Sequence, residues 1–382
     1  MVRKVTLLGT LPPIKGISDY CIEQARTLGL KINVVFLNFK AIYPEFLYPG
    51  GTKENDPSFR APESQNIEVR NILAWYNPFS WVSAGFGAEG EIFHFHWWTY
   101  FLFPVVFTVA LIAKLRGKKI VCTVHNVIAH ESNFLDRLLT GTMFMLPDRF
   151  IVHTQKNMEQ LRGAYNIKQS AISVIPQGVY AFYLGKKVSK AEARKKLGIP
   201  GKARAVLYFG NIRKYKGVED FIEAFKIAVE KDRSLFLVIA GRPWKEELRN
   251  SINSSVKGIK GKKIVLDYIA SSDIKYFFEA ADVVVLPYRN FTAQSALGNI
   301  ALAFGKPMIV SDAGGLPELV LDRKMVFRAG NPEGLASKIM LAFSEKGLLQ
   351  SMALDSKKLG QKYSWESISD STIKLYDALL RQ

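Results

Sequence analysis

Short apolar runs recur along the chain and are separated by longer segments of mixed polarity. Lys4–Leu8, Lys119–Val124, Ala205–Phe209 and Val283–Leu286 are examples, each with at most two polar residues. Nearly continuous apolar runs are typical of strands buried on both faces of a parallel sheet, where helices connect one strand to the next. The alternation predicts an α/β protein with doubly wound, Rossmann-like sheets.

The clearest example of this alternation lies between residues 283 and 321. Val283–Leu286 is expected to be a strand, followed by a helix from about 295 to 304 and a second strand at Met308–Val310. Gly314-Gly315 then leads into a segment expected to be helical from about Leu316. Open α/β sheets bind ligands at the carboxyl ends of their strands, and helix N-termini suit anionic groups such as phosphate.

Length and composition are those of a folded protein with two domains. The chain has 382 residues, of which 48% are hydrophobic and 23% charged. Cys21 and Cys122 show neither metal-binding nor redox spacing, and the chain enters a predicted strand at Lys4 without a cleavable signal. We therefore predict a cytoplasmic protein.

One uncharged run raises the question of a membrane span. Trp97–Ala113 has no charge over 17 residues, just short of the ~20 that a spanning helix needs. A buried helix of an α/β domain is favoured because a predicted strand begins at Lys119. A helix in the membrane interface is the main alternative, and a true span is the least favoured reading.

The formal net charge of +18 is unevenly distributed. Residues 186–216 hold eleven basic residues and one acid, Glu192. Such a patch can attract nucleic acid, an anionic lipid surface or a diphosphate, although most of these lysines are expected to be solvated. No recognised nucleic-acid motif accompanies the charge, so no nucleic-acid partner is predicted.

The predicted strand that ends at Val124 delivers His125 and Asn126 to its carboxyl end, where active-site residues of this fold class collect. A neutral imidazole can both donate and accept hydrogen bonds, so it can bind a polar ligand. A purely structural histidine is the alternative. Glu131, in the following loop, is a candidate for orienting an acceptor or for acid–base catalysis.

His94 and His96 share one face of another predicted strand, a spacing that also occurs in metal sites. No third ligand lies nearby in the sequence, so no metal is predicted. Structural histidines, or one that lines a ligand-binding cleft, are favoured.

Two glycine-containing loops follow predicted strands. Gly16 closes the turn after the first strand, where a residue without a Cβ lets the main chain approach a ligand, although an ordinary turn is the alternative. The loop from Gly210 to Gly217 contains Arg213 and Lys216 and precedes a predicted helix. An arginine can grip phosphate oxygens with two hydrogen bonds while a lysine adds a point charge, so the pair suits a diphosphate.

These motifs together resemble glycosyltransferase family 4, whose members are retaining sugar transferases with the GT-B architecture. The matching residues are Leu286-Pro287, 303–307, Ser311-Asp312, 314–318, Lys216-Gly217 and the Thr-x-His context of His125. The resemblance implies two Rossmann-like domains facing a central cleft, with a C-terminal helix that crosses back. Residues 1–178 are then an acceptor-side domain, 179–366 a nucleotide-sugar domain, and 367–382 the returning helix.

The implied activity is metal-independent transfer of a sugar, with retention, from a UDP- or GDP-linked donor to an acceptor hydroxyl. The nucleotide sugar is a substrate, so no cofactor is expected. The resemblance assigns catalysis to His125, Arg213 and Lys216. Substrate binding is assigned to Gly16, Asn126, Glu131, Gly210, Gly241, Gln294, Ser295, Gly315 and Glu318.

One departure from the family is large. The family usually carries two glutamates separated by seven residues, and the corresponding positions here are Thr292 or Ala293 and Asn299 or Ile300. A catalytically weak nucleotide-sugar-binding protein or partner subunit is therefore an alternative, as is an inverting enzyme. The expected acceptor is a lipid-linked saccharide or polysaccharide precursor, reached by peripheral contact with an anionic membrane.

Overall fold

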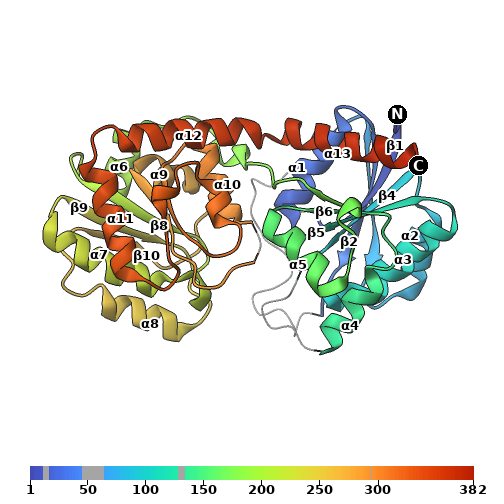
Figure 1. Ribbon diagram of the computed structural model, residues 1–382, viewed down its shortest axis with the longest axis horizontal. Helices are drawn as coiled ribbons and strands as arrows, with labels where there is room; N and C mark the ends of the chain where they lie inside the picture. The colour runs from blue at the N-terminus through green and yellow to red at the C-terminus, as the bar shows by residue number, and fades with distance from the viewer. Residues whose placement is uncertain (12–16, 45–63, 128–133, 293) are drawn as a thin grey trace. The chain divides into compact units, whose positions relative to one another are not determined.

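The computed structural model describes residues 1–11, 17–44, 64–127, 134–292 and 294–382. The chain forms two compact units, each built around its own parallel sheet (Figure 1). Unit 1 comprises Met1–Gly178 together with Ser364–Gln382, and unit 2 comprises Val179–Tyr363. The predicted α/β class with two doubly wound sheets is confirmed.

In the described part of unit 1, seven strands form one sheet in the order β3-β2-β1-β4-β5-β6-β7, and each neighbouring pair is parallel. The strand order reverses between β1 and β4, which places a topological switch point at their carboxyl ends. The strands are β1 (Lys4–Leu8), β2 (Asn33–Ala41), β3 (Ile67–Ala74), β4 (Ile92–Trp97), β5 (Lys119–Val124), β6 (Arg149–Val152) and β7 (Ile172–Val174).

The helices of unit 1 cover this sheet. The last helix of the chain packs against the first, with Ser369 donating a hydrogen bond to Thr27 (2.5 Å). Thr154 accepts a hydrogen bond from the backbone N–H of Asn157 and so caps the helix that begins at Gln155. The helices are α1 (Ser18–Gly29), α2 (Pro78–Phe86), α3 (Phe103–Leu115), α4 (Phe134–Met143), α5 (Gln155–Tyr165) and α13 (Trp365–Leu380).

In the described part of unit 2, six parallel strands follow the order β10-β9-β8-β11-β12-β13. The order reverses between β8 and β11, so the loops after these two strands flank the switch point. The strands are β8 (Arg204–Phe209), β9 (Leu235–Ala240), β10 (Lys262–Val265), β11 (Val283–Leu286), β12 (Met308–Ser311) and β13 (Val326–Phe327).

The helices of unit 2 include a lysine-rich helix that begins at Lys190 and two consecutive helices from Pro332 onward. They are α6 (Lys190–Leu197), α7 (Val218–Lys231), α8 (Glu246–Ser255), α9 (Ser271–Ala280), α10 (Ala296–Ala303), α11 (Pro332–Ser344) and α12 (Leu348–Lys362).

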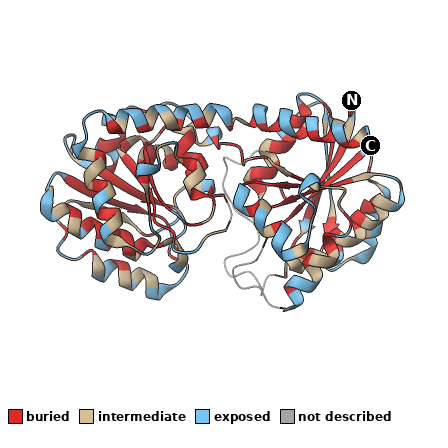
Figure 2. Cartoon of the chain, viewed as in Figure 1, coloured by how far each residue is buried: buried red, intermediate tan, exposed pale blue. Residues whose placement is uncertain are grey.

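The apolar runs of the sequence form the cores of both sheets (Figure 2). All four residues of β11 are buried, as a strand covered on both faces requires. The helix expected from Leu316 is wrong in type, because only a single 3₁₀ turn, Leu316–Leu319, forms before the backbone becomes extended at Val320. The edge strands β3 and β13 were not predicted.

One side of the uncharged run Trp97–Ala113 packs into the core of unit 1. Trp97 is a buried residue of β4, and α3 buries Val105, Val106 and Val109 against the core. Across the described ranges, no helix combines the length and apolarity that crossing a bilayer requires.

Candidate functional site

In unit 2, the loops after β8 and β11 are joined at the switch point. The backbone N–H of Arg289 donates to the carbonyl of Tyr215 (2.7 Å), and its guanidinium holds the buried carboxylate of Asp220 on α7. Gly217 has φ of +66°, and a Cβ built there would lie 1.9 Å from the Pro287 carbonyl oxygen. The close approach of the two loops therefore requires glycine at position 217.

The predicted cations lie on the first of these loops. Arg213 is exposed, with its guanidinium 4.3 Å from the ring centroid of Trp244. Lys216 is half-buried, with Nζ 5.6 Å from the ring centroid of Tyr288. Burial, and secondarily the charge of Arg213, lowers the pKa of Lys216 to about 8. The two cations have no carboxylate within ion-pair distance among the described residues, so their charge is available to an anionic ligand.

Gly210 and Gly241 bring the main chains after β8 and β9 together. Both have positive φ, +103° and +141°, and a Cβ on Gly241 would lie 2.1 Å from the Gly210 carbonyl oxygen. Ile212 forms a bridge with Pro243 that extends the pairing beyond the two strands. These glycines are needed for backbone packing, which also fixes the path of the loop that carries the cations.

Ser295 and Gln294 lie at the start of α10, as the sequence predicted. The Ser295 hydroxyl accepts a hydrogen bond from the backbone of Gly298 and lies 3.2 Å from the hydroxyl of Tyr288. The amide of Gln294 donates to that of Asn299 at 3.4 Å, and both side chains are buried. Two neutral amides thus stand near the positions where the resembled family carries acids; Ala293 lies outside the described residues.

Gly315 and Glu318 belong to the 3₁₀ turn after β12. The backbone N–H of Glu318 donates to the carbonyl of Gly315 (3.2 Å), and the Glu318 side chain is half-buried. Gly314, at φ +57°, packs against the carbonyl of Phe291 in the loop after β11. The turn after β12 therefore touches the loop after β11.

In unit 1, four histidines and one tyrosine form a cluster at the carboxyl ends of β4, β5 and β6. The ring of Tyr20, from α1, lies within 5.5 Å, centroid to centroid, of the rings of His96, His125 and His153. Nδ1 of His96 is 3.1 Å from Nε2 of His125. His94 stacks on His96 with ring centroids 5.2 Å apart.

The four histidines differ in their hydrogen bonds. His94 bonds Tyr376 and Thr123 through its two ring nitrogens at 2.6 and 2.7 Å, so it is a satisfied structural histidine. Nδ1 of His153 lies 3.0 Å from the carbonyl oxygen of Ile175. Because a carbonyl oxygen only accepts, Nδ1–H of His153 is the donor. Within the described residues, Nε2 of His96 and Nε2 of His153 are buried without a hydrogen-bond partner.

Burial lowers the pKa of every histidine in this cluster. The pKa of His94 falls to about 3 and that of His153 to about 4, and those of His96 and His125 also fall well below their usual range. The rings are therefore neutral at physiological pH. A neutral imidazole keeps one donor and one acceptor nitrogen, which suits a sugar hydroxyl.

Asn126 continues the chain beyond His125 and donates through its amide to the carbonyl of Trp98 (3.3 Å). It thereby joins the loop after β5 to the loop after β4. Gly16 and Glu131 lie outside the described residues. No group of three or more His, Cys, Asp or Glu side chains in the described ranges is arranged to hold a metal ion.

Sequence reasoning missed several of these contacts. Trp244 and Asp220, which position Arg213 and Arg289, carry no motif that marks them. Tyr20 lies on α1 and becomes central only because the strand order brings β4, β5 and β6 beside that helix.

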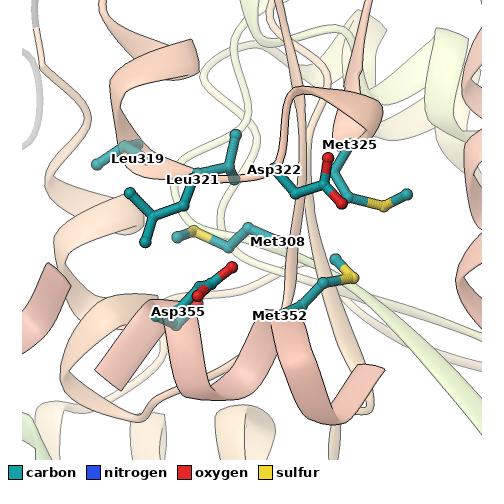
Figure 3. Close-up of a pocket in the computed structure, with 9 residues that line it drawn as sticks. Met308, Leu319, Leu321, Asp322, Met325, Met352 and Asp355 are labelled. Carbon is teal, nitrogen blue, oxygen red and sulfur yellow. The ribbon is translucent and has the colours of Figure 1, made fainter. Parts of the chain in front are cut away.

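A small cavity lies elsewhere in unit 2, at the amino end of β12. Its volume is about 10 Å³, room for about one water molecule. Figure 3 shows Met308, Met325 and Met352 around it, with Asp322 and Asp355. The cavity is too small for a sugar or a nucleotide.

Two family models match the chain. Residues 45–181 match "Glycosyltransferase Family 4", and residues 189–359 match "Glycosyl transferases group 1". The chain therefore belongs to the group 1 and family 4 glycosyltransferases and has the GT-B fold.

Several proteins with similar sequences are named as glycosyltransferases. An uncharacterized glycosyltransferase of Methanocaldococcus jannaschii is 27% identical over 232 residues, which are 57% of each chain. A D-inositol 3-phosphate glycosyltransferase of Corynebacterium urealyticum is 24% identical over 324 residues, 77% of this chain and 72% of that one. A lipopolysaccharide 1,2-N-acetylglucosaminetransferase of Salmonella typhimurium is 26% identical over 52% of this chain and 55% of its own.

Solved structures show the same fold across the whole chain. HepE of Anabaena, in complex with UDP and glucose, superposes with a TM-score of 0.74 at 14% identity and covers 98% of this chain and 100% of its own. Sucrose-phosphate synthase of Thermosynechococcus elongatus gives a TM-score of 0.73 at 18% identity over 99% of both chains.

Proposed function

We propose that the protein transfers a sugar, with retention of its anomeric configuration, from a nucleotide diphosphate donor to an acceptor hydroxyl. The observation that carries the proposal is the pair Arg213 and Lys216 at the switch point of unit 2, two cations with no carboxylate partner in the described residues. Family membership supplies the reaction class. A diphosphate is the anion that this pair suits.

In the proposed reaction, the bond between the anomeric carbon and the diphosphate oxygen breaks while the acceptor oxygen bonds to the same carbon on the same face. The proton of the acceptor hydroxyl passes to the departing phosphate oxygen. Arg213 and Lys216 stabilise the charge that develops on the diphosphate, the kind of preorganised electrostatic effect that dominates many enzymes. His125 orients the donor sugar through hydrogen bonds.

UDP-linked sugars are the first donors to test, because the crystal structure of HepE is a complex with UDP and glucose. A GDP-linked donor is the second. The Salmonella relative, named for lipopolysaccharide, favours a lipid-linked or polysaccharide precursor as the acceptor, and the corynebacterial relative favours a phosphorylated cyclitol. With a lipid-linked acceptor, the protein would work at the cytoplasmic face of a membrane.

The proposal is tested by incubating the protein with UDP- and GDP-sugars and candidate acceptors. The measurements are nucleotide release and the anomeric configuration of the product by NMR. Lys216→Ala is the informative variant, and Lys214→Ala, which removes an exposed lysine two residues away, is its matched control. An inverted product would refute retention, and equal rates in the two variants would remove the loop from the reaction.

A second candidate is a nucleotide-sugar-binding protein without turnover. The buried amide pair of Gln294 and Asn299, in the region where the family carries acids, favours it. Nucleotide-sugar binding without release of nucleotide, whatever the acceptor, would identify this second function.

A further inference from the structure

Helix α4 buries two polar side chains beside Met143 and exposes three apolar side chains. Asp136 and Thr140 are buried and hydrogen-bonded to each other at 3.1 Å. Phe134 is 82% exposed, and Leu135 and Leu138 are each more than half exposed. A helix of a water-soluble domain ordinarily has the opposite orientation, so this arrangement calls for an apolar neighbour.

Helix α2 carries a similar outward stripe. Phe79, Val82 and Phe86 follow helical spacing, and the two phenylalanines are 84% and 62% exposed. None of the nine residues of α2 is charged. The apolar stripe therefore has no charged side chain on its own helix to cover it.

Helix α3 joins these two stripes into one surface. A Cβ on Gly85 of α2 would lie 2.7 Å from Ile112, so α2 and α3 pack closely, and α3 also contacts α4. At the C-terminal end of α3, Arg116 donates to the carbonyl of Phe86, and Lys114 donates to that of Leu146. Leu115 is 79% exposed at this same end. We call the outer side of α2, α3 and α4 the apolar face.

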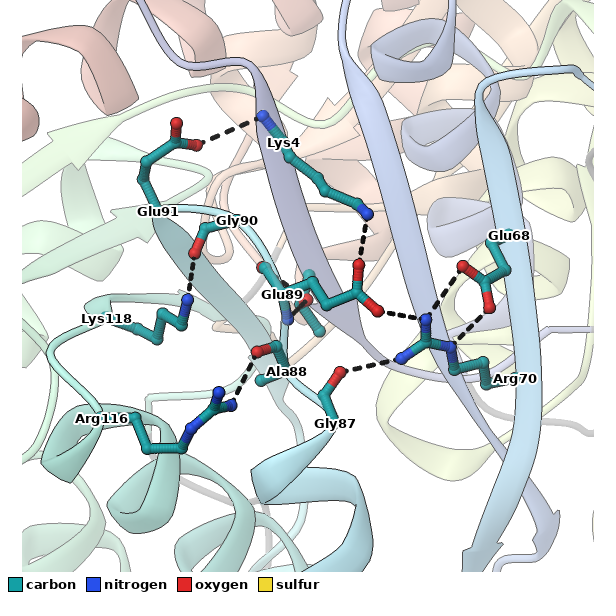
Figure 4. Close-up of polar contacts among 11 residues, drawn as sticks. Lys4, Glu68, Arg70, Gly87, Ala88, Glu89, Gly90, Glu91, Arg116 and Lys118 are labelled. Carbon is teal, nitrogen blue, oxygen red and sulfur yellow. Dashed lines mark hydrogen bonds and ion pairs between the residues drawn. The ribbon is translucent and has the colours of Figure 1, made fainter.

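Positive charge borders the apolar face. Arg116 and Lys118 bond backbone carbonyls, as Figure 4 shows, and a carbonyl leaves their charges uncompensated. Arg137 projects from the exposed side of α4. Of the nearby acids, Asp136 is buried, Glu89 is held by Lys4 and Arg70, and Glu91 accepts from the backbone of Lys4 (Figure 4). Asp148 is paired with Lys114 and accepts from the backbone of Ile120.

We propose that the apolar face docks on an anionic membrane surface. Exposed aromatic and aliphatic side chains bordered by cations suit the boundary between lipid headgroups and acyl chains, where each basic residue near anionic lipid adds to binding. A second copy of the chain is disfavoured, because two basic rims would oppose each other in a protein of net charge +18. The docking rests on the proposed transfer to a lipid-linked acceptor, which requires contact with a bilayer.

Co-sedimentation with lipid vesicles tests the proposal. Vesicles of phosphatidylcholine alone are compared with vesicles that also contain phosphatidylglycerol, at low and at physiological salt. The apolar variant is Phe79→Ser, Phe134→Ser and Leu138→Ser combined, and the charge variant is Arg137→Glu. Leu354→Ser, at an exposed leucine of α12 in unit 2, is the matched control.

We expect the wild-type protein and Leu354→Ser to bind the anionic vesicles, and salt to weaken that binding. The apolar variant should bind at least about tenfold more weakly, since three side chains no longer insert. Arg137→Glu should lose affinity for anionic vesicles alone. Wild-type protein that stays in the supernatant at low salt, or an apolar variant that binds like the control, would overturn the proposal.

Two further measurements distinguish membrane docking from a dimer interface and from the proposed transferase activity. Sedimentation velocity detects a dimer, and a dimer abolished by the apolar variant would assign the face to a second copy and overturn membrane docking. UDP binding by the same variants reports on unit 2 alone. Wild-type protein that binds UDP or GDP but no vesicles would overturn membrane docking and leave the donor site standing. Protein that binds anionic vesicles but neither nucleotide would overturn the donor site and the transferase proposal.

Discussion

The imidazole rings of His96 and His125 share a hydrogen bond of 3.1 Å between Nδ1 of the first and Nε2 of the second. Burial keeps both rings neutral, so one of the two nitrogens carries the proton and the other accepts it. The tautomer of His125 therefore depends on that of His96. The buried strand residue His96 thus determines whether Nδ1 of His125 donates or accepts a hydrogen bond toward a substrate.

Replacing His125 should impair turnover far more than nucleotide binding. His125→Ala is expected to lower kcat by about a hundredfold or more, the usual scale for a positioned catalytic side chain, and to leave UDP affinity nearly unchanged. His96→Asn should retain more activity than His96→Ala, since an amide can replace Nδ1 in the shared bond. Steady-state kinetics and UDP titration measure both; full activity in His125→Ala would make it a structural histidine.

The phosphate grip should depend on pH through Lys216. Arg213→Ala and Lys216→Ala should each weaken UDP binding by roughly 1.5–3 kcal/mol. Because the pKa of Lys216 is lowered to about 8, its charge is present below that pH and lost above it. UDP affinity should accordingly fall as pH rises through 8 in the wild type.

Calorimetric titration across this pH range gives the comparison. Lys216→Arg, which stays charged, should show no such fall. A wild-type affinity that is flat to pH 9, or a decline of equal size in Lys216→Arg, would show that Lys216 does not contact the diphosphate.

Gly217 should be far less replaceable than another glycine of the same conformation. Gly217 and Gly198 have φ of +66° and +69°, but a Cβ on Gly217 would strike Pro287 while one on Gly198 meets nothing within 4 Å. Gly198→Ala should cost about 1–2 kcal/mol of stability, the left-handed conformation alone. Gly217→Ala should cost more and also abolish UDP binding, as measured by thermal unfolding with and without UDP.

Acid should destabilise unit 1 through its buried histidines. Their pKa values are lower in the folded than in the unfolded protein, so unfolding takes up protons below the ordinary value of 6.5. The stability they contribute is fully present above pH 6.5 and lost as pH falls towards about 4, at about 1.4 kcal/mol per pH unit for each histidine.

Unfolding in urea between pH 7.5 and 5 measures this loss. His153→Asn should flatten the decline, since one titrating ring is removed. A free energy of unfolding that is constant over this range would show that the histidines are not buried in neutral form.

Local sequence patterns predicted the parts of the fold that depend on neighbouring residues. Buried strands such as β8 and β11 are confirmed, because apolar continuity is a local property. The strand β3 was not predicted because it lacks the continuous apolar run that marked the other strands; only its last two residues, Leu73 and Ala74, are buried. The 3₁₀ turn at Leu316–Leu319 looked like a helix start because Pro317 and Glu318 suit either.

Contacts between residues far apart in the sequence could not be predicted from such local patterns. The pairing of Arg289 with Asp220 joins residues 69 positions apart, and Arg213 meets Trp244 across two loops. The side of α4 that faces the core could not be predicted either, because apolar periodicity identifies an amphipathic helix without indicating which side is buried. Such features depend on strand order and helix placement, which the sequence pattern leaves open.

The central claim is that unit 2 grips a nucleotide diphosphate through Arg213 and Lys216. Thermal unfolding with UDP, GDP, ADP and their sugar conjugates tests it most directly. A nucleotide present at 100 times its Kd stabilises the fold by about 2.7 kcal/mol, which corresponds to a rise in Tm of about 5–10 °C. We predict such a rise with one base, lost in an Arg213→Ala, Lys216→Ala double variant and retained in Lys214→Ala. No rise with any nucleotide, or an undiminished rise in the double variant, would contradict the claim.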